Sequence, residues 1–311
     1  MEQLTKRAAS KGDRVMSDAT LRQGNRLFEL ILRETDPHAF SQALIENWGV
    51  VQAIGRGEAD QATIAAWMQQ HGNPYRSEKV EPRFFYPEGY KPNMVDEQVA
   101  ILLDRLPWLD TSHVVEIAAD WGQYEQADGL YVVPKPTVLA AHLGLEDHWT
   151  NFGLLTEQGP LAALADQRTF TNYRAGELGA DRYRLAESAK AALQALETSQ
   201  PGDLLVFPAQ TGRLYAGFST RNAVWEIGHE ANQWPVPAYC GGWMLYVNPH
   251  RLEKFEHLAI DCPGDEYRLG ASGEFSRALC FDFDGGRLYC DRRFVGYAYG
   301  DFGAASGFVR Q

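Results

Sequence analysis

The sequence predicts an α+β fold in which a mostly helical N-terminal part packs against a C-terminal antiparallel or mixed β-sheet. Two observations carry this prediction. Before the pair Pro201-Gly202, apolar residues recur mainly at helical spacing; after it come short aromatic runs punctuated by glycine, which are typical of strands. We therefore divide the chain into a flexible tail (1–16), a mainly helical part (17–200) and a β-rich part (201–311).

Helical spacing places the elements of the first part. The clearest early helix begins at Asp60 and ends at Gly72, with Ile64, Trp67 and Met68 along its apolar stripe. Further helices are expected near 27–33, from 36, and over 95–106 and 111–121. Two more helical stretches are expected over 147–165, interrupted at Gly159-Pro160, and a last helix begins near Asp181 with its apolar stripe ending at Leu196. Between them, residues 73–93 contain four prolines and predict an ordered loop or an edge strand. A short β-type run covers 130–133.

Apolar runs of strand length define the second part. Strands are expected over 204–207, 214–218, 243–247 and 258–260, with a turn at 209–212 after the first of them. A helix is expected from Thr220 to about Asn232, because Ser219 is a favourable N-cap. These runs supply the strands of the predicted sheet.

The segment 280–290 predicts a hairpin. If the two glycines at its centre form a two-residue turn, Phe283 lies opposite Leu288 and the apolar residues share one face. A three-residue turn would instead pair Phe283 with Arg287. The first register is favoured, and it places the two cysteines at the ends of the hairpin on opposite faces, where they cannot form a disulfide.

The composition is that of a soluble globular protein. Hydrophobic residues make up 45% and charged residues 23% of the 311 residues. No stretch approaches the roughly 18 apolar residues that a membrane helix needs, and residues 1–24 lack the apolar core of a secretory signal. The four cysteines include no C-x-x-C pair, so reduced thiols are expected. A cytoplasmic location without a membrane element follows.

The charge distribution bears on the kind of partner. The net charge is −12, of which residues 201–311 carry −3 and residues 1–200 carry the remainder. Neither part is a basic footprint for nucleic acid, so a nucleic-acid partner is disfavoured, and only the basic residues of the tail leave that role as a third hypothesis. A protein partner with a basic surface, or a cation, suits this charge better.

The strongest candidate for chemistry is Asp261-Cys262-Pro263-Gly264-Asp265-Glu266, which follows the apolar run 258–260 and is expected in a loop at a strand end. Asp261, Asp265 and Glu266 could together bind a divalent cation such as Mg²⁺. Cys262 is a poor nucleophile, because neighbouring carboxylates oppose thiolate formation. The alternative is a turn whose acids are solvated.

Other patterns carry less chemistry. Glu226 and His229 share a helix face at i, i+3, but the zinc-protease helix motif is absent because position 233 is glutamine. No phosphate-binding glycine loop and no G-x-S-x-G motif occurs. Tyr297 and Tyr299 lie on one side of an extended run, where they would form either a stacking platform, a peptide groove or part of the core.

Two functions follow as hypotheses. The leading one is a soluble, non-enzymatic recognition or binding module, which contacts another protein through the acidic, aromatic-rich surface of the second part and needs no cofactor. The alternative is a metal-dependent hydrolase or phosphoesterase centred on Asp261, Asp265 and Glu266, with His229 as an auxiliary base and a divalent cation as its cofactor.

Overall fold

The computed structural model describes residues 53, 73–122, 124–230, 232–270 and 273–310, and the chain divides into two compact units, Met1–Ser77 and Glu78–Gln311. The expected tail over 1–16 and the helices expected before residue 73 lie outside the described residues. The second unit contains every element discussed below.

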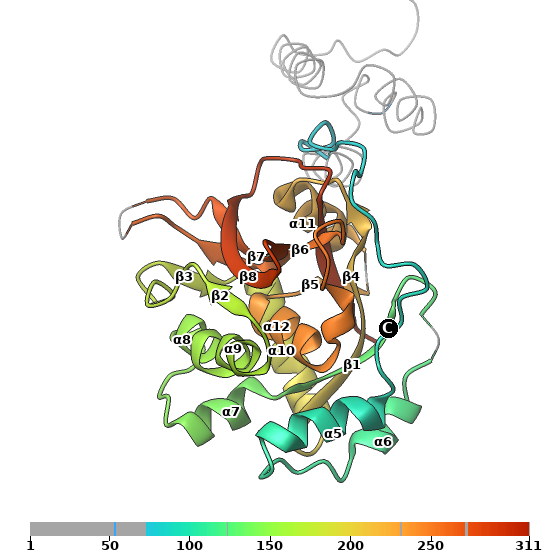
Figure 1. Cartoon of the computed structure of the whole chain (residues 1–311), viewed down its shortest axis with the longest axis vertical. Helices are drawn as coiled ribbons and strands as arrows, with labels where there is room; N and C mark the ends of the chain where they lie inside the picture. The colour runs from blue at the N-terminus through green and yellow to red at the C-terminus, as the bar shows by residue number, and fades with distance from the viewer. Residues whose placement is uncertain (1–52, 54–72, 123, 231, 271–272, 311) are drawn as a thin grey trace, which may run out of the picture. The chain divides into compact units, whose positions relative to one another are not determined.

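One mixed sheet organises the second unit (Figure 1). Nine strands of the described residues have the order β1-β4-β9-β6-β7-β8-β2, with β3 paired to β6 and β5 to β9. Two pairs, β6 with β9 and β2 with β8, are parallel, and the other pairs are antiparallel. The strands are β1 (Gly129–Pro134), β2 (Phe170–Asn172), β3 (Tyr183–Leu185), β4 (Leu204–Ala216), β5 (Gln233–Pro235), β6 (Ala259–Tyr267), β7 (Arg277–Asp284), β8 (Arg287–Phe294) and β9 (Phe302–Phe308).

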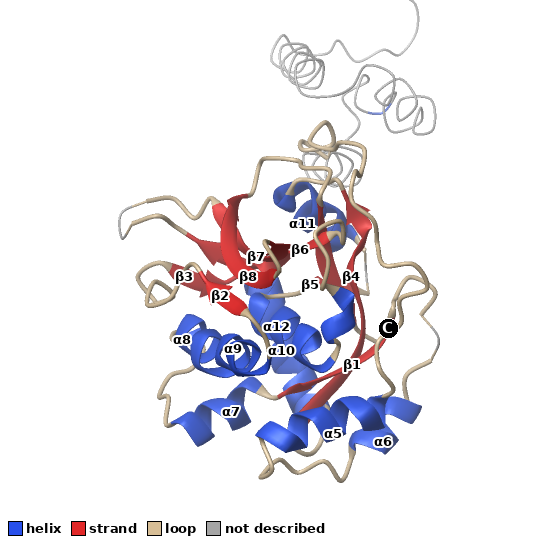
Figure 2. Cartoon of the chain, viewed as in Figure 1, coloured by secondary structure: helices blue, strands red, loops and turns tan. Residues whose placement is uncertain are grey.

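Helices surround this sheet, and α11 lies at the opposite end of the unit from α5, α6 and α7 (Figure 2). They are α5 (Val95–Arg105), α6 (Val114–Ala119), α7 (Pro136–Leu143), α8 (Phe152–Thr156), a π-helical turn (Glu157–Leu161), α9 (Ala162–Gln167), α10 (Glu187–Ser199), α11 (Thr220–His229), α12 (Ala238–Val247) and a 3₁₀ turn (Pro249–Arg251). The α+β class with a mixed sheet is confirmed. The expected interruption at Gly159-Pro160 is the π-helical turn, and helix α11 has the expected cap, since the Ser219 side chain accepts from Asn222 N.

Helix α12 replaces a strand that the sequence predicted over 243–247. All ten of its residues are buried, and it lies in the middle of the unit (Figure 1). A helix that is apolar on every side has no polar face, so its sequence lacks the 3.6-residue stripe that distinguishes a helix from a buried strand. The strand prediction was wrong for this reason.

Two further predictions were wrong because strands continue through residues typical of turns. The turn expected over 209–212 is part of β4, a single strand whose register with β9 shifts between Thr211 and Tyr215. Likewise Asp261 to Glu266 lie within β6 rather than in a loop after it. Both segments form ladder pairs with other strands, residues 209–211 with β9 and residues 261–266 with β3, β7 and β9, and this pairing outweighs the local turn propensity.

The hairpin prediction is confirmed. Strands β7 and β8 pair Phe283 with Leu288 around a two-residue turn at Gly285 and Gly286, which both have positive φ. All four cysteines are free and buried. Pro201-Gly202 lies between α10 and β4, and strands from both sides of it join the same sheet.

Candidate functional site

The four residues singled out in the sequence do not converge. Asp261 and Asp265 are buried in β6 but point to opposite sides of the sheet, toward α11 and α12 respectively. Glu266 is partly exposed and its Oε2 accepts from Arg184 Nε at 2.5 Å. His229 ends α11, stacked on Trp225 with 3.7 Å between the ring centroids.

Asp265 caps the buried helix α12. Its Oδ2 accepts from the backbone N–H of Ala238 at 2.9 Å, and its Oδ1 accepts from the Tyr183 hydroxyl at 2.5 Å. Burial raises the pKa of Asp265 to about 7, while these two hydrogen bonds act in the opposite direction. The carboxyl group is therefore committed to holding the N-terminus of α12 in the core.

Asp261 belongs to a second cluster, on the α11 side of the sheet. Its Oδ1 lies 3.6 Å from Arg293 Nη1, and the two side chains are 2% and 11% exposed. Burial raises the pKa of Asp261 to about 6, whereas Arg293 and the Thr220 hydroxyl lower it. Asp301 and Asp282 raise it further through charge repulsion. Asp261 thus balances a buried guanidinium.

Among the described residues, no group of three or more His, Cys, Asp and Glu side chains is arranged to hold a metal ion. The thiols offer no nucleophile either, because burial raises the pKa of Cys240, Cys262, Cys280 and Cys290 well above the ordinary value. The residues of the proposed hydrolase site are consequently scattered or occupied by structural contacts.

A different feature brings potential contact residues together. Three loops, 81–86, 253–257 and 295–301, carry the residues that we call the aromatic loop surface: Phe84, Phe85, Phe255, Tyr297 and Tyr299. Four of these are strongly exposed, from 40% for Tyr299 to 70% for Phe85. Exposed large aromatic side chains are thus concentrated on these three loops.

Backbone hydrogen bonds join the three loops. The Phe84 N–H donates to the Gly300 carbonyl at 3.2 Å, and the Phe85 N–H donates to the Glu256 carbonyl at 2.9 Å. The rings of Phe84 and Phe255 meet edge to face at 5.0 Å between centroids. The loops therefore lie side by side although they are far apart in the sequence.

A buried polar cluster anchors the first two loops to β4. The carboxylate of Asp128, whose side chain is 2% exposed, accepts from Thr211 N at 2.9 Å and from the Tyr86 hydroxyl. Arg251 donates from Nε to Thr211 Oγ1 at 2.7 Å and from Nη1 to the Leu258 carbonyl at 3.0 Å. Since Tyr86 is the last residue of the first loop and Arg251 closely precedes the second, this cluster fixes both of them.

The Asp261–Arg293 pair anchors the third loop. The Arg293 guanidinium carbon lies 3.4 Å from the Phe302 ring centroid and 4.0 Å from that of Tyr299. Stacking on a guanidinium that is itself paired with a buried carboxylate restrains the Tyr299 ring. The candidate residue Asp261 thus acts beneath the surface, not in it.

Charges around the aromatic loop surface are mixed. Arg83, with a side chain that is 72% exposed, lies 4.0 Å from Asp301, and Glu253, Lys254 and Glu256 are exposed nearby. The surface therefore offers aromatic rings for stacking and apolar contact, together with charged groups of both signs.

Sequence reasoning found part of this surface. Tyr297 and Tyr299 were singled out as a stacking platform, a peptide groove or part of the core. Both tyrosines are exposed, so the core alternative is wrong for these two residues, although the following strand β9 is buried. No local sequence pattern pointed to the anchors Asp128, Arg251 and Arg293, because their partners lie up to 83 residues away in the chain.

Comparison with known protein families, with curated proteins and with solved structures found no match. In the part of the chain that the structure describes, no helix has the length and apolar character required to cross a membrane.

Proposed function

We propose that this protein is a recognition module that binds another protein through the aromatic loop surface. The observation that carries the proposal is the exposure of Phe85, Phe255, Tyr297 and Tyr299 on three hydrogen-bonded loops. Aromatic residues supply a disproportionate share of the binding energy in protein interfaces.

The anchoring of the loops favours binding. Because Asp128, Arg251 and the Asp261–Arg293 pair restrain the backbone from below, little conformational entropy is lost when a partner orders the exposed rings. The anchors are themselves buried and paired, so they contribute positioning and the rings contribute contact.

The partner is expected to carry an apolar patch flanked by basic residues. The aromatic loop surface has both charge signs, whereas the whole chain has a net charge of −12. The negative electrostatic field of the chain accelerates its encounter with a basic partner, and added salt screens this attraction. The metal-dependent hydrolase has no comparable support, because its candidate residues do not come together.

The test compares surface variants in quantitative affinity capture from a lysate of the source cells. Phe85→Ala and Tyr297→Ala are the test variants, and Leu269→Ala is the matched control, since Leu269 is 54% exposed outside this surface. We expect a partner that is retained by the control and lost from both test variants, with an unchanged melting temperature for all three.

Direct titration then completes the test. The captured partner, once purified, should bind the Phe85→Ala variant at least about tenfold more weakly than the native chain. Capture should weaken as salt is raised if basic residues contribute. Equal capture by all variants, or capture of nothing that depends on Phe85 or Tyr297, would overturn the proposal.

A further inference from the structure

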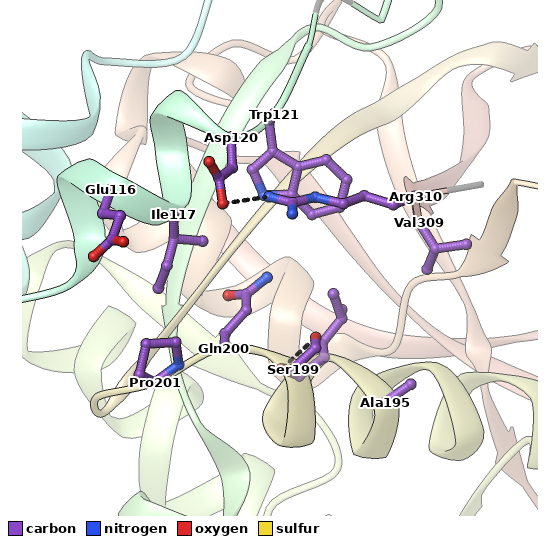
Figure 3. Close-up of a pocket in the computed structure, with 11 residues that line it drawn as sticks. Glu116, Ile117, Asp120, Trp121, Ala195, Ser199, Gln200, Pro201, Val309 and Arg310 are labelled. Carbon is purple, nitrogen blue, oxygen red and sulfur yellow. Dashed lines mark hydrogen bonds and ion pairs between the residues drawn. The ribbon is translucent and has the colours of Figure 1, made fainter.

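A pocket separate from the aromatic loop surface lies between α6 and α10, with residues 309 and 310 on one side (Figure 3). Its volume is about 350 Å³, which is at the lower end of the range of small-molecule sites. Ile117, Trp121 and Leu196 contribute apolar walls, and Glu116 and Asp120 place two carboxylates at its edge.

The walls of this pocket are held in place from behind. The indole Nε1 of Trp121 donates to the Val206 carbonyl at 2.8 Å, which fixes the ring plane. The Gln200 side chain accepts from Val206 N at 2.8 Å and donates to the Val206 carbonyl at 2.9 Å. Because these groups are already ordered, a ligand need not order them.

The chain places a cation of its own in the pocket. Figure 3 shows the Arg310 side chain against the Trp121 ring, with its guanidinium directed to Asp120. The guanidinium carbon lies 4.8 Å from the ring centroid, and Nη2 lies 3.6 Å from Asp120 Oδ2. An indole face beside a carboxylate is a favourable environment for an organic cation.

Arg310 interacts only weakly with the carboxylates at the edge of the pocket. The side chains of Arg310 and Asp120 are 50% and 62% exposed, and exposed ion pairs of this kind contribute little to stability. The second carboxylate, Glu116, is 79% exposed, and its one ion contact among the described residues is a long one, 3.8 Å, with His113 Nδ1. The pocket therefore has one carboxylate more than Arg310 can neutralise.

We propose that this pocket binds an organic cation that has an apolar body and a single guanidinium or amino group. The body occupies the space between Ile117, Trp121 and Leu196, and the cationic group takes the position beside Asp120 that Arg310 now holds. Arg310 moves into solvent when the ligand binds, so it acts as a built-in competitor. A free amine and an arginine side chain of a peptide share this chemistry.

The experiment titrates the full chain with benzamidine by calorimetry and ligand-observed NMR. Benzamide and benzoate, which have the same ring with a neutral or an anionic group, are the matched probes. We expect saturable binding of benzamidine and no saturable binding of the other two. Acetyl-arginine methylamide distinguishes a peptide source: tighter binding than benzamidine assigns the site to an arginine side chain, and weaker binding assigns it to a free cation.

Variants of the native chain locate the site. Asp120→Asn should weaken benzamidine binding about threefold by removing one exposed charged contact, and Arg310→Ala should strengthen it by removing the competitor. Asp104→Asn, at an exposed position of α5, is the control and should change nothing. Stronger binding of benzoate, or loss of benzamidine binding in the Arg310→Ala variant, would overturn the proposal.

Discussion

Asp261 and Asp265 show that residue type and spacing in the sequence can predict a site that the fold does not form. Asp261 and Asp265 are four positions apart in a segment rich in acids, which indicates a cation site. In the folded protein one carboxylate balances Arg293 and the other caps α12. Both are structural, and each is buried in surroundings that disfavour its charge.

At this scale we predict a defined pH dependence of stability. The pKa of Asp265 rises from 3.8 to about 7 on folding. Between these values the folded protein holds a proton that the unfolded chain has lost, so the free energy of unfolding falls as pH rises toward 7 and levels off above it. Asp265→Asn cannot ionise, and its amide can still accept from Ala238 N, so the variant should lose this fall.

Urea denaturation at several pH values from 5 to 8 measures the effect. The difference between native chain and variant isolates Asp265 from other titrating groups, including His148 and His257, whose pKa values are lowered by burial. Glu266→Gln, on the same strand but partly exposed, serves as the control and should retain the native slope. Parallel curves for the native chain and Asp265→Asn would contradict the prediction.

Strand β6 explains why its sequence looks like a turn. Gly264 N donates to the Val236 carbonyl at 3.1 Å, and the Gly264 carbonyl accepts from Ala186 N at 2.9 Å. A Cβ atom at Gly264 would lie 2.6 Å from both the Pro235 carbonyl oxygen and Pro237 N. Glycine and aspartate are present because the strand passes the start of α12, not because the chain reverses there.

Gly264→Ala should therefore destabilise the protein. The clash is with backbone atoms that cannot rotate away, so we expect a loss of about 2–4 kcal/mol in the free energy of unfolding, measured by chemical denaturation. Gly228→Ala in α11 is the control, because a Cβ there meets nothing within 4 Å. That variant should gain about 0.5–1 kcal/mol from helix propensity. A neutral Gly264→Ala would refute this account of β6.

Elements were predictable from the sequence where local forces decide them. The hairpin at 280–290 has a two-glycine turn and alternating side chains, so its register followed from neighbours alone. Helix α12 and the continuity of β4 depend on the elements that pack against them, and a local sequence pattern does not reveal this tertiary packing. The same holds for the candidate site: Tyr297, Tyr299 and Asp261 were candidates from the sequence, but Arg293, the partner of Asp261, was not.

For the whole molecule, the pairing of strands across Pro201 sets the smallest unit that should fold. Strands β1 and β3 precede this point and pair with β4 and β6, which follow it. A fragment of residues 73–311 should therefore unfold in one cooperative transition, whereas residues 201–311 alone should not fold. Calorimetry and amide NMR spectra of both fragments test this, and a cooperative transition in the shorter fragment would contradict it.

The position of β9 has a consequence for synthesis. Phe302–Phe308 lies between β4 and β6 and also pairs with β5, yet the ribosome makes it after all three. Until β9 emerges, the nascent chain exposes the apolar edge of β4, completed some ninety residues earlier. Chaperones that bind extended apolar segments should therefore associate with ribosome-bound chains of this protein until the last strand is available.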